Sequence, residues 1–177
     1  FIAARGAVLQ ILTPKFNIWV DGSHHHLTRQ SGAGVLFTAA EDGTELFRAD
    51  LPTSHLAPGD STQAEIIAAT MALKMAHKFS ELSGRSIYSF HGDNRCVLNM
   101  MIEDKPPSTI NTNHGLAKLC HDFFDVLRSG GTPPRIEHAN DTNNENMKQV
   151  HKLANDGAAV RKSRSFQTFN TVLNSLR

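Results

Sequence analysis

The hydrophobic and polar positions near the start of the chain follow the two-residue period of a β-strand. Phe16, Ile18 and Val20 share one face of such a strand, and the turn-forming residues 21–23 are expected to end it. Three segments show strand patterning: residues 16–21, 34–38 and 45–49. The last two are separated by the Glu-Asp-Gly sequence of residues 41–43, which predicts a hairpin turn. The first third of the chain is therefore expected to form three antiparallel strands.

The pattern then changes to the period of a helix. Apolar side chains such as Ile66 and Leu73 recur at helical spacing over residues 62–79. Thr62 and Glu65 have the spacing of a capping box at the start of this helix. Five further elements are predicted: a strand at 87–90, a short helix around 97–101, a helix around 116–127, a strand at 135–139 and a helix at 145–161. The predicted order is β-β-β-α-β-α-α-β-α, which indicates an α/β domain.

Composition and charge exclude several other classes of protein. The 177 residues are 40% hydrophobic and 20% charged, which fits neither a disordered tail nor a coiled coil. The net charge is +1, far from that of a protein that coats nucleic acid through charge alone, so any nucleic-acid binding is expected to be local. No apolar run approaches the roughly 18 residues that span a bilayer, so no membrane partner is expected.

The domain organisation follows from where the periodic pattern begins and ends. Residues 16–160 are expected to form one domain, after an N-terminal extension or linker at 1–15 and before a basic C-terminal tail at 161–177. The chain begins with Phe1, which is expected of a domain within a longer protein. The two cysteines, Cys96 and Cys120, are expected to pack without a disulfide or zinc ion, so we expect an intracellular protein, cytoplasmic or nuclear. A monomer is the default expectation, since no feature of the sequence indicates an oligomer.

Acidic residues stand at the ends of several predicted elements. Asp21 closes the first strand, Glu65 opens the first helix and Asp93 follows the fourth strand. Each has an ordinary structural explanation as a turn, a capping box or a helix N-cap. Together, at one edge of an α/β sheet, they would repel one another unless a cation were bound. Hard divalent cations with oxygen ligands suit such a site, and two of them can promote hydrolysis of a phosphodiester.

These positions and their surroundings resemble the motifs of type 1 ribonucleases H, especially the domains of retroelement polyproteins. The matching segments are residues 18–23, 32–34, 63–73, 93–94 and 152–158. The resemblance covers about residues 16–160 and implies an RNase H-like fold, in which three antiparallel strands and then two parallel ones form a five-stranded mixed sheet flanked by helices. It also implies cleavage of the RNA strand of an RNA–DNA hybrid with two Mg²⁺ or Mn²⁺ ions. The polymerase part of a parent chain is a further expected partner.

The resemblance also implies roles for individual residues. Asp21, Glu65 and Asp93 match three of the family's metal-binding carboxylates. Four further residues match positions that contact the hybrid: Gly22, Ser23, Thr62 and Asn94. The protein is expected to recognise the shape of the backbone, with 2′-hydroxyl groups distinguishing RNA from DNA.

The sequence departs from the family at the fourth carboxylate. His151 aligns with that position, while Asp141 stands ten residues earlier, where the family has a mobile histidine. Asp156 is the alternative fourth ligand, although a shift of five residues turns a helix by about 140° and would move the apolar face of this helix away from the core. Another alternative places His138 in the role of the loop histidine. If His151 is a ligand, Mn²⁺ is favoured over Mg²⁺, because Mg²⁺ prefers oxygen ligands.

Two further interpretations remain open at this point. The three consecutive histidines, residues 24–26, are interpreted as a solvated loop, because neighbouring side chains of an extended segment point in opposite directions. The exchange of Asp141 and His151 also allows a catalytically degenerate domain that serves as a structural or nucleic-acid-binding module. A resolvase or transposase core of the same superfamily is disfavoured by the match at residues 153–158.

Overall fold

A computed structural model describes residues 13–56, 58–103, 122, 125 and 134–159. Within this part of the chain, five strands form one mixed sheet: β1 (Lys15–His25), β2 (Gln30–Ala39), β3 (Glu45–Pro52), β4 (Ser86–Gly92) and β5 (Arg135–His138). Their order in the sheet is β3-β2-β1-β4-β5. β1, β2 and β3 are antiparallel neighbours, and β4 runs parallel to both β1 and β5. The predicted arrangement of three antiparallel and two parallel strands is confirmed.

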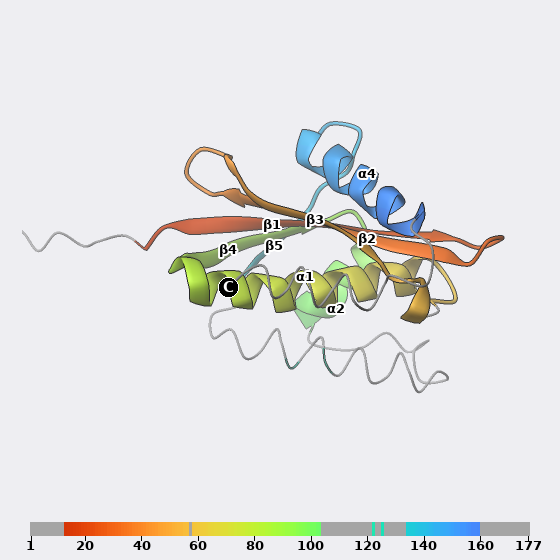
Figure 1. Ribbon diagram of the computed structural model, residues 1–177. Coiled ribbons are helices and arrows are strands. Elements are labelled where there is room, and N and C mark those ends of the chain that lie inside the picture. Colours follow the sequence, from red (N-terminus) through yellow and green to blue (C-terminus); the bar gives the residue numbers. More distant parts are fainter. Residues whose placement is uncertain (1–12, 57, 104–121, 123–124, 126–133, 160–177) are drawn as a thin grey trace, which may run out of the picture.

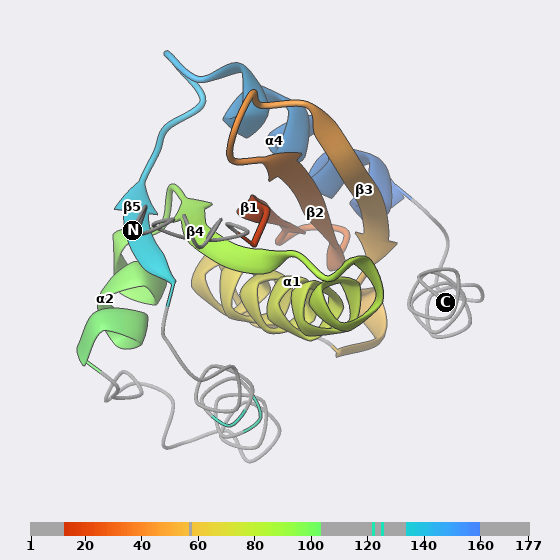
Figure 2. The ribbon, with the colours of Figure 1, turned by 90° about the vertical axis from the view of Figure 1, so that its left-hand side faces the viewer.

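Helices cover both faces of the sheet. On one face lie α1 (Ser61–Ser83) and α2 (Arg95–Glu103), and on the other lies α4 (Glu145–Ala159) (Figures 1 and 2). A 3-10 turn, η1 (Ser54–Leu56), connects β3 to α1. None of the described helices is both long enough and apolar enough to cross a membrane.

Each face of the sheet has its own apolar core. The larger core joins the sheet to α1, with members that include Phe16, Ile18, Phe37, Leu73 and Phe90. The smaller core joins the sheet to α4 and consists of Trp19, Leu36, Met147 and Val150. Because neighbouring residues of a strand point to opposite faces, Ile18 and Trp19 contribute to different cores. The sheet is therefore buried on both sides where α1 and α4 contact it.

The first strand is longer than the sequence pattern predicted. β1 continues through residues 21–23 to His25, and its pairing with β2 runs unbroken from Phe16 opposite Ala39 to His25 opposite Gln30. The prediction of a turn at Asp-Gly-Ser is wrong, because the hydrogen bonds of the antiparallel ladder override the local turn preference. His24 and His25 consequently belong to the strand, and only His26 of the three histidines lies in the turn that follows.

The start of α1 also differs from the prediction. Asp60 is the N-cap, and its carboxylate accepts a hydrogen bond from the backbone N–H of Gln63 at 2.8 Å. The side chain of Gln63 in turn accepts a hydrogen bond from the backbone N–H of Gly59. The expected capping box of Thr62 and Glu65 is therefore wrong, since this reciprocal capping lies two residues earlier. As a result, the side chain of Glu65 is free to face β1.

The remaining predicted elements have mixed outcomes. β4, α2, β5 and α4 occur where the patterns predicted them, and the side chain of Asn94 caps α2 by accepting hydrogen bonds from the backbone N–H groups of Cys96 and Val97. Cys96 is exposed, so the prediction that it packs is wrong. The predicted helix at 116–127, Cys120, most of the N-terminal extension and the basic tail lie outside the described residues.

Candidate active site

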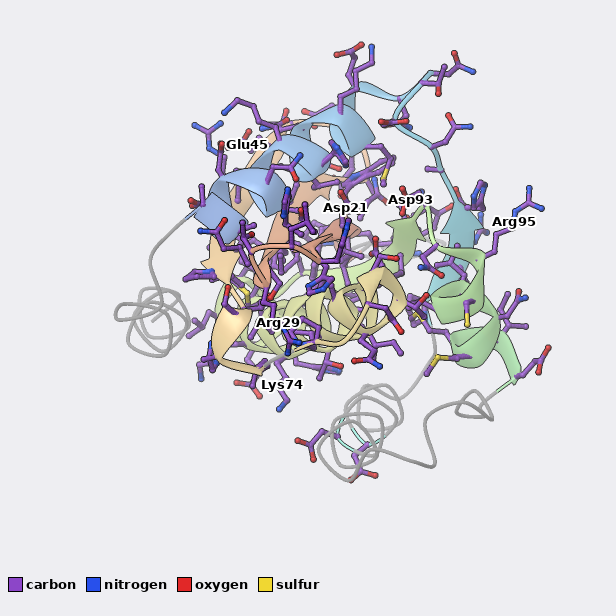
Figure 3. All side chains as sticks on the ribbon, turned by 90° about the vertical axis from the view of Figure 1, so that its right-hand side faces the viewer. Asp21, Arg29, Glu45, Lys74, Asp93 and Arg95 are labelled. Carbon is purple, nitrogen blue, oxygen red and sulfur yellow. The ribbon has the colours of Figure 1, made fainter. Side chains whose placement is uncertain are left out.

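Three carboxylates from different elements meet at one edge of the sheet. Asp21 lies in β1, Glu65 lies in the second turn of α1, and Asp93 directly follows β4. One oxygen atom from each of the three side chains lies within 4.8 Å of the others. Figure 3 shows Asp21 and Asp93 close together. The sequence therefore predicted a group of side chains that the fold does bring together, and we call these three residues the acidic cluster.

Gly22 brings α1 close enough to β1 for the cluster to form. A Cβ atom at this position would lie 2.6 Å from the carbonyl carbon of Ala64 and from the backbone nitrogen of Glu65, so only glycine fits. The backbone N–H of Gly22 lies 2.9 Å from Oδ1 of Asp21 and 3.0 Å from Oε2 of Glu65, and it donates to both. Gly22 therefore positions two of the three carboxylates.

The acidic cluster holds negative charge in a partly buried place. Burial, together with the neighbouring Asp21 and Asp93 carboxylates, raises the pKa of Glu65 to about 10. Burial and the Asp21 carboxylate also raise the pKa of Asp93, while His151 acts in the opposite direction. Without a cation, the cluster therefore keeps a proton on Glu65 at neutral pH. An all-oxygen donor set that holds a proton for lack of positive charge fits a hard divalent cation.

His151 lies beside the acidic cluster, on α4. Its Nδ1 atom is 2.8 Å from Oδ2 of Asp21, and the Asp21 side chain is almost fully buried while that of His151 is half exposed. The close approach of α4 to β2 fixes this contact, because Gly34 pairs with Asp21 in the sheet and a Cβ atom at Gly34 would lie 2.0 Å from the carbonyl oxygen of Val150. Val150, the residue before His151, thus packs directly on Gly34, the β2 residue paired with Asp21.

The alternative fourth ligand, Asp156, lies elsewhere on α4. Its carboxylate accepts a hydrogen bond of 2.7 Å from the ammonium group of Lys152, and both side chains are at least half exposed. Of the two candidates for the fourth position, the structure brings His151 to Asp21 and pairs Asp156 with Lys152.

Two residues near the end of β5, His138 within the strand and Asp141 after it, lie farther from the acidic cluster. Asp141 is exposed in the turn that connects these elements, and its negative charge contributes to the raised pKa of Asp93. The Nε2 atom of His138, the alternative loop histidine, is 3.1 Å from the backbone carbonyl oxygen of Asp93. His138 therefore contacts the backbone that carries Asp93.

The residues expected at the hybrid have defined neighbours. The hydroxyl of Ser23 is 2.7 Å from Oδ1 of Asn155 on α4, and Thr62 is half-buried in the first turn of α1. Asn94 caps α2, as described above. The rings of His25 and His26 stack at 6.0 Å beyond the cluster, and within the described part of the chain neither they nor His24 belongs to a group of metal-ligating side chains.

His91 is a buried residue beside the cluster that the sequence patterns did not single out. Its ring stacks on that of Trp19 with 3.8 Å between centroids, and its Nε2 atom is 2.7 Å from the hydroxyl of Ser89. Burial lowers the pKa of His91, while the nearby Glu137 carboxylate acts in the opposite direction. The available signal was its position two residues before Asp93, on the strand that Asp93 follows.

No protein-family model and no curated protein sequence matches this chain, but solved structures do. An RNase H1 from the archaeon Halobacterium salinarum is similar with a TM-score of 0.62 and 17% identity, covering 81% of this chain and 96% of that one. LC11-RNase H1 in complex with an RNA/DNA hybrid is similar with a TM-score of 0.56 and 16% identity, covering 81% of this chain and 96% of that one.

A viral protein shows the same similarity. The protease-reverse transcriptase of prototype foamy virus is similar with a TM-score of 0.64 and 17% identity, covering 92% of this chain and 23% of that one. The fold of this chain is therefore RNase H-like, as the sequence motifs implied.

Proposed function

We propose that this chain is a metal-dependent ribonuclease H that hydrolyses the RNA strand of RNA–DNA hybrids. The observation that carries the proposal is the meeting of three carboxylate oxygens within 4.8 Å, where β4 ends beside β1 in an RNase H-like sheet. The raised pKa of Glu65 supports a site that binds a cation, because a bound positive charge would replace the proton on this carboxyl group. The similarity to solved RNase H structures shows the fold alone, and the chemistry of the acidic cluster supports the activity.

The residues of the chain have distinct parts in this activity. Asp21, Glu65 and Asp93 would hold two divalent ions, which when bound activate a water molecule and stabilise the leaving oxygen of the phosphodiester. The N–H of Gly22 orients the Asp21 and Glu65 carboxylates at distances of 2.9 and 3.0 Å. His151 either completes the ligand set or orients Asp21 through its 2.8 Å contact.

The side chains around the cluster are proposed to contact the hybrid. Gly22, Ser23, Thr62 and Asn94 lie on the same segments as the three carboxylates, so a strand held at the cluster would pass beside them. Asp141 is exposed beside Asp93, and its charge would repel the product phosphate and favour its release. We also propose an intracellular setting, a monomeric domain and a polymerase in the same parent chain.

The choice of metal follows from His151. An imidazole nitrogen in place of a carboxylate oxygen removes one negative charge and offers a ligand that Mg²⁺ accepts poorly. We therefore propose that Mn²⁺ supports more activity than Mg²⁺. The His151 contact with Asp21 supports this assignment over Asp156, which is paired with Lys152.

The test is cleavage of a labelled RNA–DNA hybrid with each metal ion. Wild-type protein should release RNA fragments, and Asp93→Asn should lower the rate at least about a hundredfold, because a ligand charge is lost. Asp156→Asn, a matched change on the exposed side of α4, should stay within about twofold of wild type. A folded wild-type protein without activity in either ion would refute the proposal.

A non-catalytic nucleic-acid-binding module is the second candidate. The observation that favours it is the contact of His151 with Asp21, where a histidine takes the position of a carboxylate. This candidate predicts that the protein binds the hybrid without cleaving it and that Asp93→Asn leaves the affinity unchanged. Hybrid binding by a folded protein that cleaves nothing in either ion would therefore favour the module.

A further inference from the structure

A second concave site lies on the face of the sheet that carries α4. A pocket of about 330 Å³ opens between β4, β5 and the start of α4. Helix α4 packs on β1, β2 and β3, so it leaves this part of the sheet accessible. Its lining includes six residues that bear on its chemistry: Trp19, His91, Glu137, Asn140, Asn143 and Asn144. The acidic cluster includes none of these residues. We call this site the β5 pocket.

The aromatic side of the β5 pocket is held rigidly. Trp19 and His91 stack with ring planes 11° apart, and both are nearly fully buried. The indole N–H of Trp19 donates to the hydroxyl of Thr38 at 3.0 Å, and Nε2 of His91 contacts the hydroxyl of Ser89 at 2.7 Å. Two ordered ring systems with their polar atoms already paired form one rigid wall of the pocket.

The polar side of the β5 pocket offers both acceptors and donors. Glu137 is half exposed, with Oε2 3.5 Å from Nδ1 of His91, and its carboxylate can accept further hydrogen bonds. The Oδ1 atom of Asn144 accepts hydrogen bonds from the backbone N–H groups of Asn146 and Met147. These bonds fix the orientation of the amide, so its N–H groups point away from the two backbone donors. Asn140 and Asn143 add two exposed amides.

This combination selects one class of ligand. The Glu137 carboxylate repels an anion, so a free phosphate group is a poor occupant. A nucleobase has a flat aromatic face together with N–H donors and ring acceptors along its edge, and carboxylates and asparagine amides pair with such edges. The lining therefore matches a neutral heteroaromatic base better than a phosphate.

The β5 pocket is also joined to the acidic cluster through the backbone. Nε2 of His138 is 3.1 Å from the carbonyl oxygen of Asp93, and the N–H of Ala139 donates to the carbonyl oxygen of Gly92 at 2.9 Å. Both His138 and Ala139 line the pocket. A strand bound at the cluster therefore lies within reach of it.

We propose that the β5 pocket binds an unpaired nucleobase of a nucleic-acid strand that extends past the acidic cluster. The proposal rests on the proposed function only for the presence of a nucleic acid, because binding of a base requires no cleavage. It assigns the pocket to single-stranded extensions, whose bases are free to leave the stack, and not to the paired hybrid.

The single tryptophan of the chain makes the β5 pocket directly observable, because Trp19 lies in its lining. The four ribonucleosides are titrated separately into the whole chain up to about 10 mM, the weak end of specific binding, while Trp19 fluorescence is recorded. Equilibrium dialysis with labelled nucleoside measures the same binding without relying on fluorescence. Inorganic phosphate is the probe for an anion site.

Variants connect the signal to the pocket. Glu137→Gln and Asn143→Ala should each weaken binding about tenfold, the effect of losing one well-placed polar contact. Glu145→Gln and Asn99→Ala are matched changes at exposed positions outside the pocket lining and should leave the affinity within about twofold. Circular dichroism confirms that each variant is folded.

The outcomes separate this proposal from the proposed function. Saturable nucleoside binding that the two pocket variants weaken supports the proposal, and it should persist in Glu65→Gln, which alters the acidic cluster and no residue of the pocket lining. Binding in a protein that cleaves no hybrid would leave the proposal standing while the proposed function fails. Cleavage without nucleoside binding, binding of phosphate as tightly as nucleoside, or equal affinity in the pocket variants would overturn it.

Discussion

Glu65 gives the metal-free protein a stability that depends on pH. Its folded pKa is about 10, against an ordinary value of 4.5, because burial and two neighbouring carboxylates disfavour the charged form. Between these two pH values, the folded state holds a proton that the unfolded state releases. The contribution of Glu65 to stability is therefore greatest below its ordinary pKa and is lost as the pH rises towards the folded pKa.

The size of this effect follows from linkage. One retained proton changes the free energy of unfolding by about 1.4 kcal/mol for each pH unit. Between about pH 6 and about pH 8 the metal-free wild type should therefore lose about 3 kcal/mol relative to Glu65→Gln, which cannot titrate. Comparison with the variant cancels other groups such as His91, whose lowered pKa acts in the opposite direction.

The assay is urea unfolding in EDTA at three pH values across this range. The unfolding free energy of wild type minus that of Glu65→Gln should fall steadily as the pH rises. Glu81→Gln, at an exposed carboxylate paired with Lys78 at 3.1 Å, is the matched control and should follow the wild type. Parallel pH dependence in wild type and Glu65→Gln would refute the reasoning about the cluster. Mn²⁺ should remove most of the pH dependence of this free-energy difference, because the ionised cluster then binds a cation and no longer needs the proton on Glu65.

Three further changes have defined outcomes. Gly34→Ala should destabilise the protein by at least about 2 kcal/mol in urea unfolding, because its Cβ would meet the Val150 carbonyl at 2.0 Å; a neutral effect would contradict the close contact of α4 with β2. Asp60→Ala should cost about 1 kcal/mol in the same assay through loss of the α1 cap, and Asp42→Ala, in an exposed turn, should cost less. His151→Asp should raise the Mg²⁺-to-Mn²⁺ activity ratio at least about tenfold; an unchanged ratio would exclude His151 from the metal site.

Much of the fold could be predicted from the sequence because its signals are local and periodic. The alternation at Phe16, Ile18 and Val20 and the helical spacing in α1 both report burial against the sheet, so the elements and their order follow from them. The three carboxylates stand where the patterns predicted the end of the first strand, the start of the first helix and the end of the fourth strand. The expected meeting of such ends at one edge of the sheet made the acidic cluster predictable.

The errors arise where tertiary contacts override local preference. Residues 21–23 have the composition of a turn, but the pairing of β1 with β2 keeps them extended, and Gly22 is required by the approach of α1. The cap of α1 lies at Asp60 because Gly59 and Gln63 complete it, so Glu65 is free for the cluster. No pattern in the sequence indicated the stacking of His91 on Trp19, since it depends on the register of two parallel strands.

The contact of His151 with Asp21 lies between these two cases. Helical periodicity favoured His151 over Asp156, because it placed the apolar face of α4 against the sheet. The contact itself depends on how closely α4 approaches β2, which Gly34 and Gly32 allow and which no periodicity reports. The sequence thus indicated the correct face of the helix, and the glycines of β2 determine the distance.

Strand-resolved cleavage of an RNA–DNA hybrid tests the central claim most directly. The hybrid is labelled on the RNA strand in one experiment and on the DNA strand in another, and each is incubated with wild-type protein in Mn²⁺ and in Mg²⁺. The account predicts internal cuts in the RNA strand alone, faster in Mn²⁺, with single-stranded RNA of the same sequence left intact. An intact hybrid in both ions, cuts in the DNA strand, or equal cutting of single-stranded RNA by the folded protein would contradict it.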